Sequence, residues 1–418
     1  MPKTTKGSPI KIELWIFFAI VALTGLAMGM SDSVISNFFK DAYDVSAKER
    51  GFLEFPRELP GVLCFLIIAL AAGIGDVPLA IIAQALAALG ILVLGLFTPS
   101  FGFMAFFLFV HSLGMHIYIP LQESIGISII GKQDLGKRMG QYTGIRTAFT
   151  MLASIIIFIG FRSGFFSFMT QIKLPFIIAA AGFIGVLALF ALLLVKYKVR
   201  GEARKKKFQI IIKKEYTLYY ILAILVGVHR QIMLVYGPWV LIEIMSRGAD
   251  TLALLTIIGS FLGIFMLPAI GRWADRFGPK VILFVEGFMF IFVYIAFGYI
   301  SDAFRTGALA MAGIPVLIVY GLYIFERITF QMGIARTMYL KTIAADPADI
   351  TPTLSTGLSM DHVVSITCAY LGGIVWFNHG PQYVFYAAAV LSIVNVVAAY
   401  KMKGPMVSPM SESIKDDS

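Results

Sequence analysis

Ionisable side chains inside long apolar stretches are the residues of this chain most able to do chemistry. Asp32 lies in the first apolar stretch and Arg230 in the first one after the midpoint. A charge in hydrocarbon is costly and usually faces a partner or a water-filled cavity. We therefore predict that Asp32 and Arg230 face each other across a cavity. Further groups expected to bind solute or proton there are Arg57, Glu58 and His229.

These groups predict binding of a charged solute together with a proton. Arg230 keeps its charge and can hold an anionic group. Burial and a nearby guanidinium change the proton affinity of a carboxyl in opposite directions, so Asp32 is our choice for the proton. His229 adjoins a charge and is a second candidate for proton handling. A permanent Asp32–Arg230 bridge that only supports the fold is the competing interpretation.

A second set of charges is predicted to form bridges that hold helices together or close a gate. Glu123 and Arg146 come at similar depth in consecutive apolar stretches, and Arg336 and Asp361 repeat this relation later in the chain. Each couple is expected to pair, and ligand contact stays open as the alternative. The remaining members of this set are His362, Glu326 and Arg327.

The composition identifies a membrane protein. Of 418 residues, 59% are hydrophobic and 14% are charged, whereas soluble domains carry about 25% charged residues. Cys64 and Cys368 both lie in apolar segments and indicate neither a disulfide nor a metal site. No Gly-rich nucleotide loop and no metal-ligand spacing stands out. We expect no cofactor, no metal and no enzymatic activity.

Twelve segments are long enough to cross a bilayer, which takes about 20 mostly apolar residues. The predicted fold is all-α, with twelve transmembrane helices in two pseudo-symmetric six-helix bundles. The segments are about 14–39, 52–72, 78–97, 102–130, 139–161, 175–195, 217–245, 252–270, 280–300, 308–343, 354–377 and 382–401.

A basic run at 196–214, with nine Lys or Arg residues, separates the two halves. Such clusters stay on the cytoplasmic side, so we expect a cytoplasmic linker at 196–216 between halves at 1–195 and 217–401. About 21 Lys and Arg residues then face the cytoplasm and about seven face outside. Both termini are predicted to be cytoplasmic, in the cell (inner) membrane, with a disordered tail at 402–418.

Short matches between the halves suggest a repeat. Gly29-Met-Ser-Asp32 aligns with Gly227-Val-His-Arg230, and Thr143-Gly144 aligns with Thr356-Gly357. Six-plus-six hydropathy with such matches is the plan of many secondary carriers.

One loop carries a more specific pattern, Gly271-Arg-Trp-Ala-Asp275-Arg276-Phe-Gly278-Pro-Lys280. It resembles the signature loop of the major facilitator superfamily, Gly-x-x-x-Asp-Arg-x-Gly with a basic end. The glycines permit close approach and a tight turn, and the Asp can receive a helix amino terminus or an arginine. The first half keeps only Gly73-Ile-Gly-Asp76 at the equivalent loop, without the Arg and the basic end.

The resemblance implies a secondary transporter that works by alternating access, and the buried charges favour a small polar or charged organic solute moved with a proton. We expect a monomer with no nucleic-acid partner. Two alternatives stay open: an exporter of amphipathic compounds or lipids on the same fold, and a non-transporting membrane sensor or scaffold.

Overall fold

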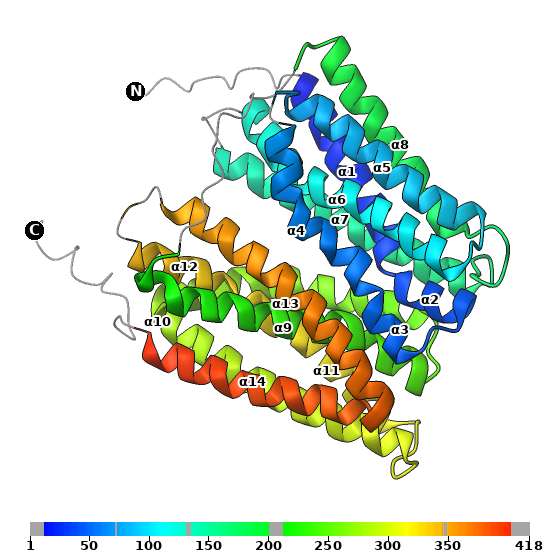
Figure 1. Cartoon of the computed structure of the whole chain (residues 1–418), viewed down its shortest axis with the longest axis vertical. Coiled ribbons are helices and arrows are strands. Elements are labelled where there is room, and N and C mark those ends of the chain that lie inside the picture. The colour runs from blue at the N-terminus through cyan, green and yellow to red at the C-terminus, as the bar shows by residue number, and fades with distance from the viewer. Residues whose placement is uncertain are drawn as a thin grey trace, which may run out of the picture. The chain divides into compact units, whose positions relative to one another are not determined.

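A computed structural model describes residues 12–71, 73–130, 135–199, 212–344, 346 and 349–402. Every regular element in these residues is helical (Figure 1). The helices are α1 (Ile12–Asp32), α2 (Ile35–Tyr43), α3 (Ala47–Phe52), α4 (Glu54–Leu70), α5 (Asp76–Leu96), α6 (Phe101–Ile130), α7 (Leu135–Arg162), α8 (Leu174–Val195), α9 (Thr217–Trp239), α10 (Ala249–Arg305), α11 (Ile314–Gln331), α12 (Ile334–Ile343), α13 (Ile350–His379) and α14 (Pro381–Lys401). A 3₁₀ turn at Lys214–Tyr216 precedes α9, and a π-helical turn at Val240–Ile244 follows it.

Ten of the described helical segments are long and apolar enough to cross a membrane. One of them, the 57-residue α10, covers the two predicted spans 252–270 and 280–300. Gly278, at φ 80° and ψ 160°, interrupts the helix between these spans. The predicted span 52–72 corresponds to the 17-residue helix α4. The arrangement is consistent with twelve spans. All-helical structure is expected in lipid, where each backbone N–H and C=O needs a partner within the segment.

Two predicted spans are broken rather than continuous. The first consists of α1 and α2, which are separated at Ser33 and Val34. The tenth, predicted at 308–343, consists of α11 and α12, with Met332 and Gly333 between them. Breaks of this kind free backbone groups inside the membrane and are tolerated where protein surrounds them.

By internal contacts the chain divides into two compact units. Unit 1 contains residues 1–34 and 63–207, and unit 2 contains residues 35–62 and 208–418. These units differ from the predicted halves at one place. The segment 35–62, which comes from the first half of the sequence, packs in unit 2 against α9 and α13. The chain therefore passes from unit 2 back into unit 1 within α4.

Within unit 1, α5 packs on α6 and α8, and α1 packs on α7 and α8. Within unit 2, α10 packs on α11 and α14, and α9 packs on α13 and α14. Gly29 of α1 lies against Thr150 and Ala153 of α7, and Gly227 of α9 lies against Asp361 of α13. The aligned glycines thus perform the same close approach in each unit, as expected for a repeat.

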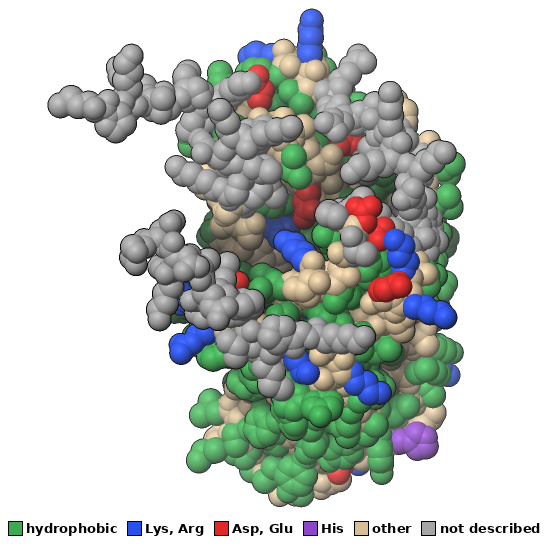
Figure 2. Space-filling model, turned by 90° about the vertical axis from the view of Figure 1, so that its left-hand side faces the viewer, with side chains coloured by type: hydrophobic (Ala, Val, Ile, Leu, Met, Phe, Trp, Pro, Cys, Tyr) green, Lys and Arg blue, Asp and Glu red, His purple; other side chains and the backbone are tan. Residues whose placement is uncertain are grey.

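Large hydrophobic side chains are exposed along the helices, for example Phe292 and Tyr299 of α10 and Val390 and Tyr400 of α14. Figure 2 shows such green side chains over broad stretches of the face in view. In a membrane protein these surfaces contact lipid. Most of the predicted basic linker and nearly all of the predicted tail lie outside the described residues.

Candidate functional site

A fully buried carboxylate, Glu54, organises the segment 35–62 within unit 2. Arg50 and Arg57 each place a guanidinium nitrogen 2.5 Å from Glu54 Oε1. Gln231 of α9 donates to Glu54 Oε2 at 2.8 Å. Because α3 runs into α4 through Leu53 in helical conformation, the spacing of 50, 54 and 57 brings all three charges to one face. This network joins α3 and α4 to α9.

The start of α3 is fixed by a complete capping box. Ser46 accepts from the backbone of Glu49, and the Glu49 side chain accepts from the backbone of Ser46. Beyond this cap, Gly51 lies where an added Cβ would meet the Ala369 carbonyl and Gly373 Cα of α13. The short helix can therefore approach α13 at backbone distance only with glycine at this position.

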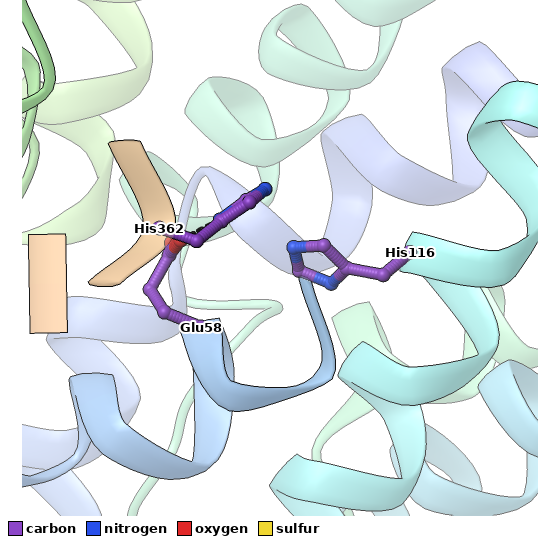
Figure 3. Close-up of side chains that lie close together, drawn as sticks. All are labelled: Glu58, His116 and His362. Carbon is purple, nitrogen blue, oxygen red and sulfur yellow. Dashed lines mark hydrogen bonds and ion pairs between the residues drawn. The ribbon is translucent and has the colours of Figure 1, made fainter. Parts of the chain in front are cut away.

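A second contact between α4 and α13 pairs Glu58 with His362. The His362 Nδ1 lies 2.7 Å from Glu58 Oε2, and both side chains are mostly buried (Figure 3). Gly61, one turn along α4, leaves room for the His362 ring, which would lie 2.6 Å from an added Cβ. Glu58 and His362 are thus brought together, although the sequence predicted Glu58 to bind solute or proton and His362 to belong to the bridges or gate.

Arg230 and Asp361 form an ion pair inside unit 2. Arg230 of α9 lies 2.7 Å from Asp361 Oδ2 of α13 and also donates to Ser365 at 3.3 Å. The Arg230 side chain is 31% exposed and that of Asp361 is 9% exposed. Asp32 lies in unit 1 and is exposed, and its predicted pairing with Arg230 stays a prediction.

The expected Arg336–Asp361 bridge is not formed. Arg336 of α12 instead donates to the fully buried Glu286 of α10 at 2.7 Å, while Asp361 pairs with Arg230. Similar depth in neighbouring helices did not decide the partner, because the rotation of each helix about its axis sets which face each charge occupies. Sequence reasoning missed Glu286, which lies in a strongly apolar stretch of α10.

The couple predicted in unit 1 is also not an ion pair. Glu123 is exposed, and in the described part of unit 1 no salt bridge joins it to Arg146. The Arg146 guanidinium lies 5.5 Å from the centre of the Tyr142 ring, at the distance of a cation–π contact.

His229 occupies an aromatic stack in unit 2. Its ring is buried and lies 4.6 Å from Phe290 and 5.4 Å from Tyr294, centre to centre. Neither ring nitrogen has a hydrogen-bond partner among the described residues. This setting is that of a packed aromatic side chain, and it gives His229 no route for a proton among these residues.

The loop at 271–280 has the backbone that its pattern predicts. Gly278 adopts a positive φ, and Lys280 donates to the Met402 carbonyl at 3.2 Å. Asp275 and Arg276 are exposed, and Arg276 lies 5.2 Å from the centre of the Phe277 ring. Within the described residues neither forms an ion pair, so their role at a gate stays a prediction.

The loop of unit 1 at residues 73–76 aligns with the loop at 271–280 differently from what the sequence pattern suggested. Gly75 at φ 89° and ψ 157° has the conformation of Gly278 and directly precedes α5. Asp76 therefore corresponds to Pro279, and it is not the counterpart of Asp275. At the amino terminus of α5 it accepts a hydrogen bond from Ser124 at 2.5 Å, where the helix dipole favours a negative charge.

Comparison with known proteins agrees with this architecture. The sequence profile of the Major Facilitator Superfamily matches residues 17–345. The chain belongs to this superfamily. Among curated protein sequences nothing matches it.

Solved structures of the superfamily fold resemble most of the chain at low sequence identity. A variant of the nucleoside transporter NupG superposes with a TM-score of 0.76 at 13% identity, covering 94% of this chain and 100% of that one. A D-xylose-proton symporter gives 0.67 at 12%, covering 94% and 98%. The POT family transporter PepTSo gives 0.70 at 11%, covering 94% and 97%. At these identities the likeness establishes the superfamily fold.

Outside the spans, this superfamily member carries one more charged cluster that sequence reasoning missed. Lys213, just before α9, contacts Asp349 at 2.5 Å, and Tyr216 donates to the same carboxylate at 2.7 Å. The hydrogen bonds from Lys213 and Tyr216 lower the pKa of Asp349, and the bond to Asp349 raises the pKa of Lys213. Both groups are therefore charged near neutral pH, and they join the start of α9 to the start of α13.

Proposed function

We propose that this chain is a secondary active transporter that moves a small polar or charged organic solute by alternating access, coupled to a proton gradient. Membership of the superfamily supports the carrier, and the charges buried within unit 2 support a polar solute. The similar solved structures include a nucleoside transporter and a D-xylose-proton symporter, and nucleosides and D-xylose are polar organic molecules.

The observation that carries this proposal is the Arg230–Asp361 pair. Arg230 is about a third exposed while its carboxylate partner is mostly buried. A carboxylate or phosphate of the solute can replace Asp361 at the guanidinium, because both offer the paired oxygens that arginine binds best. Displaced from Arg230, a buried Asp361 is best accommodated as a neutral acid. Solute binding and proton binding are thereby coupled through competition for one arginine.

Alternating access further needs contacts that form in one state and break in the other. We assign this role to the contacts that hold segment 35–62 on α9 and α13, namely the Glu54 network and the Glu58–His362 pair. With both termini and the 196–216 linker in the cytoplasm, this segment lies at the outer side of the cell membrane. Glu123, Arg146 and the Asp275–Arg276 loop remain candidates for contacts on the cytoplasmic side. The transporter is expected to act as a monomer.

A thermal-shift screen of the purified protein against pools of metabolites tests the proposal. A ligand present at a hundred times its Kd adds about 2.7 kcal/mol to the free energy of unfolding. We expect anionic solutes to stabilise the wild type but not Arg230→Gln. The matched control is Arg305→Gln, which removes an exposed arginine paired with Asp302.

The solutes found by the screen are then followed into proteoliposomes with and without an imposed pH gradient. Uptake that rises with the gradient in the wild type, and is lost in Arg230→Gln, supports the proposal. Equal stabilisation of Arg230→Gln by anionic solutes contradicts it. Stabilisation by apolar amphipathic compounds alone would favour the exporter instead.

A further inference from the structure

The lipid-facing side of α14 is a stripe of exposed apolar residues that ends in a cation. Tyr383, Val390, Val394 and Val397 are all exposed. Because a helix turns by about 100° per residue, these four positions fall within about 60° of one another around the axis. Lys401, the last residue of α14, falls in the middle of the same range and is also exposed. The face that contacts lipid therefore continues into an ammonium group at the end of the helix.

An aromatic ring and a second cation lie at this helix end. Tyr400, the neighbour of Lys401, is 65% exposed. Lys280 of α10 places its ammonium nitrogen 5.4 Å from the centre of the Tyr400 ring and donates to the Met402 carbonyl at 3.2 Å. The last carbonyls of a helix favour a positive charge, so this ammonium group is held at the end of α14. Two lysines from different helices thus lie next to one exposed tyrosine.

These two lysines have no carboxylate beside them to balance their charge. Within the described part of the chain, no ion pair is formed by Lys280 or Lys401. The sequence of α14 contains no acidic residue. The next carboxylate along α10 after Lys280 is Glu286, which is fully buried and bound to Arg336. This end of the α10–α14 pair is therefore positively charged.

A positive, half-aromatic helix end at the edge of a lipid-facing surface matches a phospholipid headgroup. Tyrosine rings are enriched at the level of the headgroups, and lysine binds phosphate as a point charge. The position of Lys280 over the Tyr400 ring occupies a place where the choline cation of a zwitterionic lipid would bind. In the predicted topology this end faces the cytoplasmic leaflet, whose anionic lipids attract basic residues.

We propose that Lys280, Tyr400 and Lys401 form a binding site for an anionic phospholipid. The two ammonium groups contact its phosphate, and its acyl chains lie along the exposed stripe of α14. This inference is independent of the proposed transport, because it depends only on the packing of α10 on α14.

Quenching of an added indole by brominated lipid tests the site locally. Tyr400→Trp keeps an aromatic ring, and its fluorescence minus that of the wild type reports on this position alone. Both proteins are reconstituted in phosphatidylcholine with a minor fraction of phosphatidylglycerol, with bromine on the acyl chains of one lipid or the other. Each lysine should favour phosphatidylglycerol roughly fivefold, and the two together roughly twenty-five-fold.

Further changes in the Tyr400→Trp background assign this preference to the lysines. Lys280→Gln combined with Lys401→Gln should abolish it, and Lys280→Arg combined with Lys401→Arg should retain it because both charges remain. Lys401→Gln alone keeps the contact between Lys280 and Met402 and should lower the preference roughly fivefold, which keeps the test decisive if the double variant folds poorly. The matched control is Lys341→Gln, which removes an exposed lysine from the last turn of α12 and should leave the preference unchanged.

Equal quenching by the two lipids in Tyr400→Trp, or a preference that survives in the folded double glutamine variant, would overturn the inference. Inorganic phosphate supplies a second test, with the protein in phosphatidylcholine alone. Phosphate should not change the melting temperature of the wild type relative to the double glutamine variant. Phosphate that stabilises the wild type but not this variant would assign the lysines to a soluble anion and refute the lipid site.

Discussion

Glu54→Gln is the sharpest test of the contact that holds segment 35–62 in unit 2. The change keeps the shape of the side chain and an oxygen for Gln231, but it removes the charge that faces Arg50 and Arg57. Arg50 is completely buried, so the variant leaves an uncompensated guanidinium in the interior.

The magnitude follows from the burial of the pair. Removing one partner of a buried ion pair costs about 3–5 kcal/mol, and each 1.4 kcal/mol is a factor of about ten in an equilibrium. If segment 35–62 separates from α9 and α13 during transport, the separated state should become more populated by about a hundredfold to a few thousandfold. The exposed pair Lys40–Asp44 supplies the control, since such pairs contribute about 0–1 kcal/mol.

The assay is labelling of a cysteine at position 369 in a background without Cys64 and Cys368. Ala369 is buried and its carbonyl lies against Gly51 of α3, so a thiol reagent reaches it only when the segment moves away. We expect Glu54→Gln to raise the labelling rate strongly and Asp44→Asn to leave it unchanged. Equal rates in wild type and a folded Glu54→Gln would refute the role of this network as a gate.

Three further changes test other parts of the structure. Gly278→Ala should lower the free energy of unfolding by about 1–3 kcal/mol because of the positive φ at this position, whereas Gly271→Ala has open space around it and should not; denaturation of both in detergent decides. The lowered pKa of Asp349 adds to the free energy of unfolding above the ordinary carboxyl pKa, and this part is lost as the pH falls through the lowered pKa; the raised pKa of Lys213 adds its part below the ordinary lysine pKa, which is lost as the pH rises through the raised pKa. Asp349→Asn should therefore be less stable than the wild type at neutral pH. Melting curves of the two proteins should converge in acid. His229→Phe keeps the aromatic stack and should leave the pH dependence of uptake unchanged, and loss of that dependence would return His229 to the proton path.

The sequence alone determined the helices and the superfamily. About 20 apolar residues in a row form a helix in lipid, because the backbone has no other partner there. Each predicted span corresponds to a helix, a pair of helices or one part of the interrupted helix α10. The loop at 271–280 carried the family resemblance, and Gly278 takes the positive φ that its place in the pattern requires. These features are local, so they can be read from consecutive residues.

Only the tertiary structure decided which charges meet. Arg336 binds Glu286 and not the expected Asp361, which binds Arg230 instead, because a partner depends on the rotation and tilt of each helix. The same holds for segment 35–62, which belongs to the first half in sequence and packs with the second.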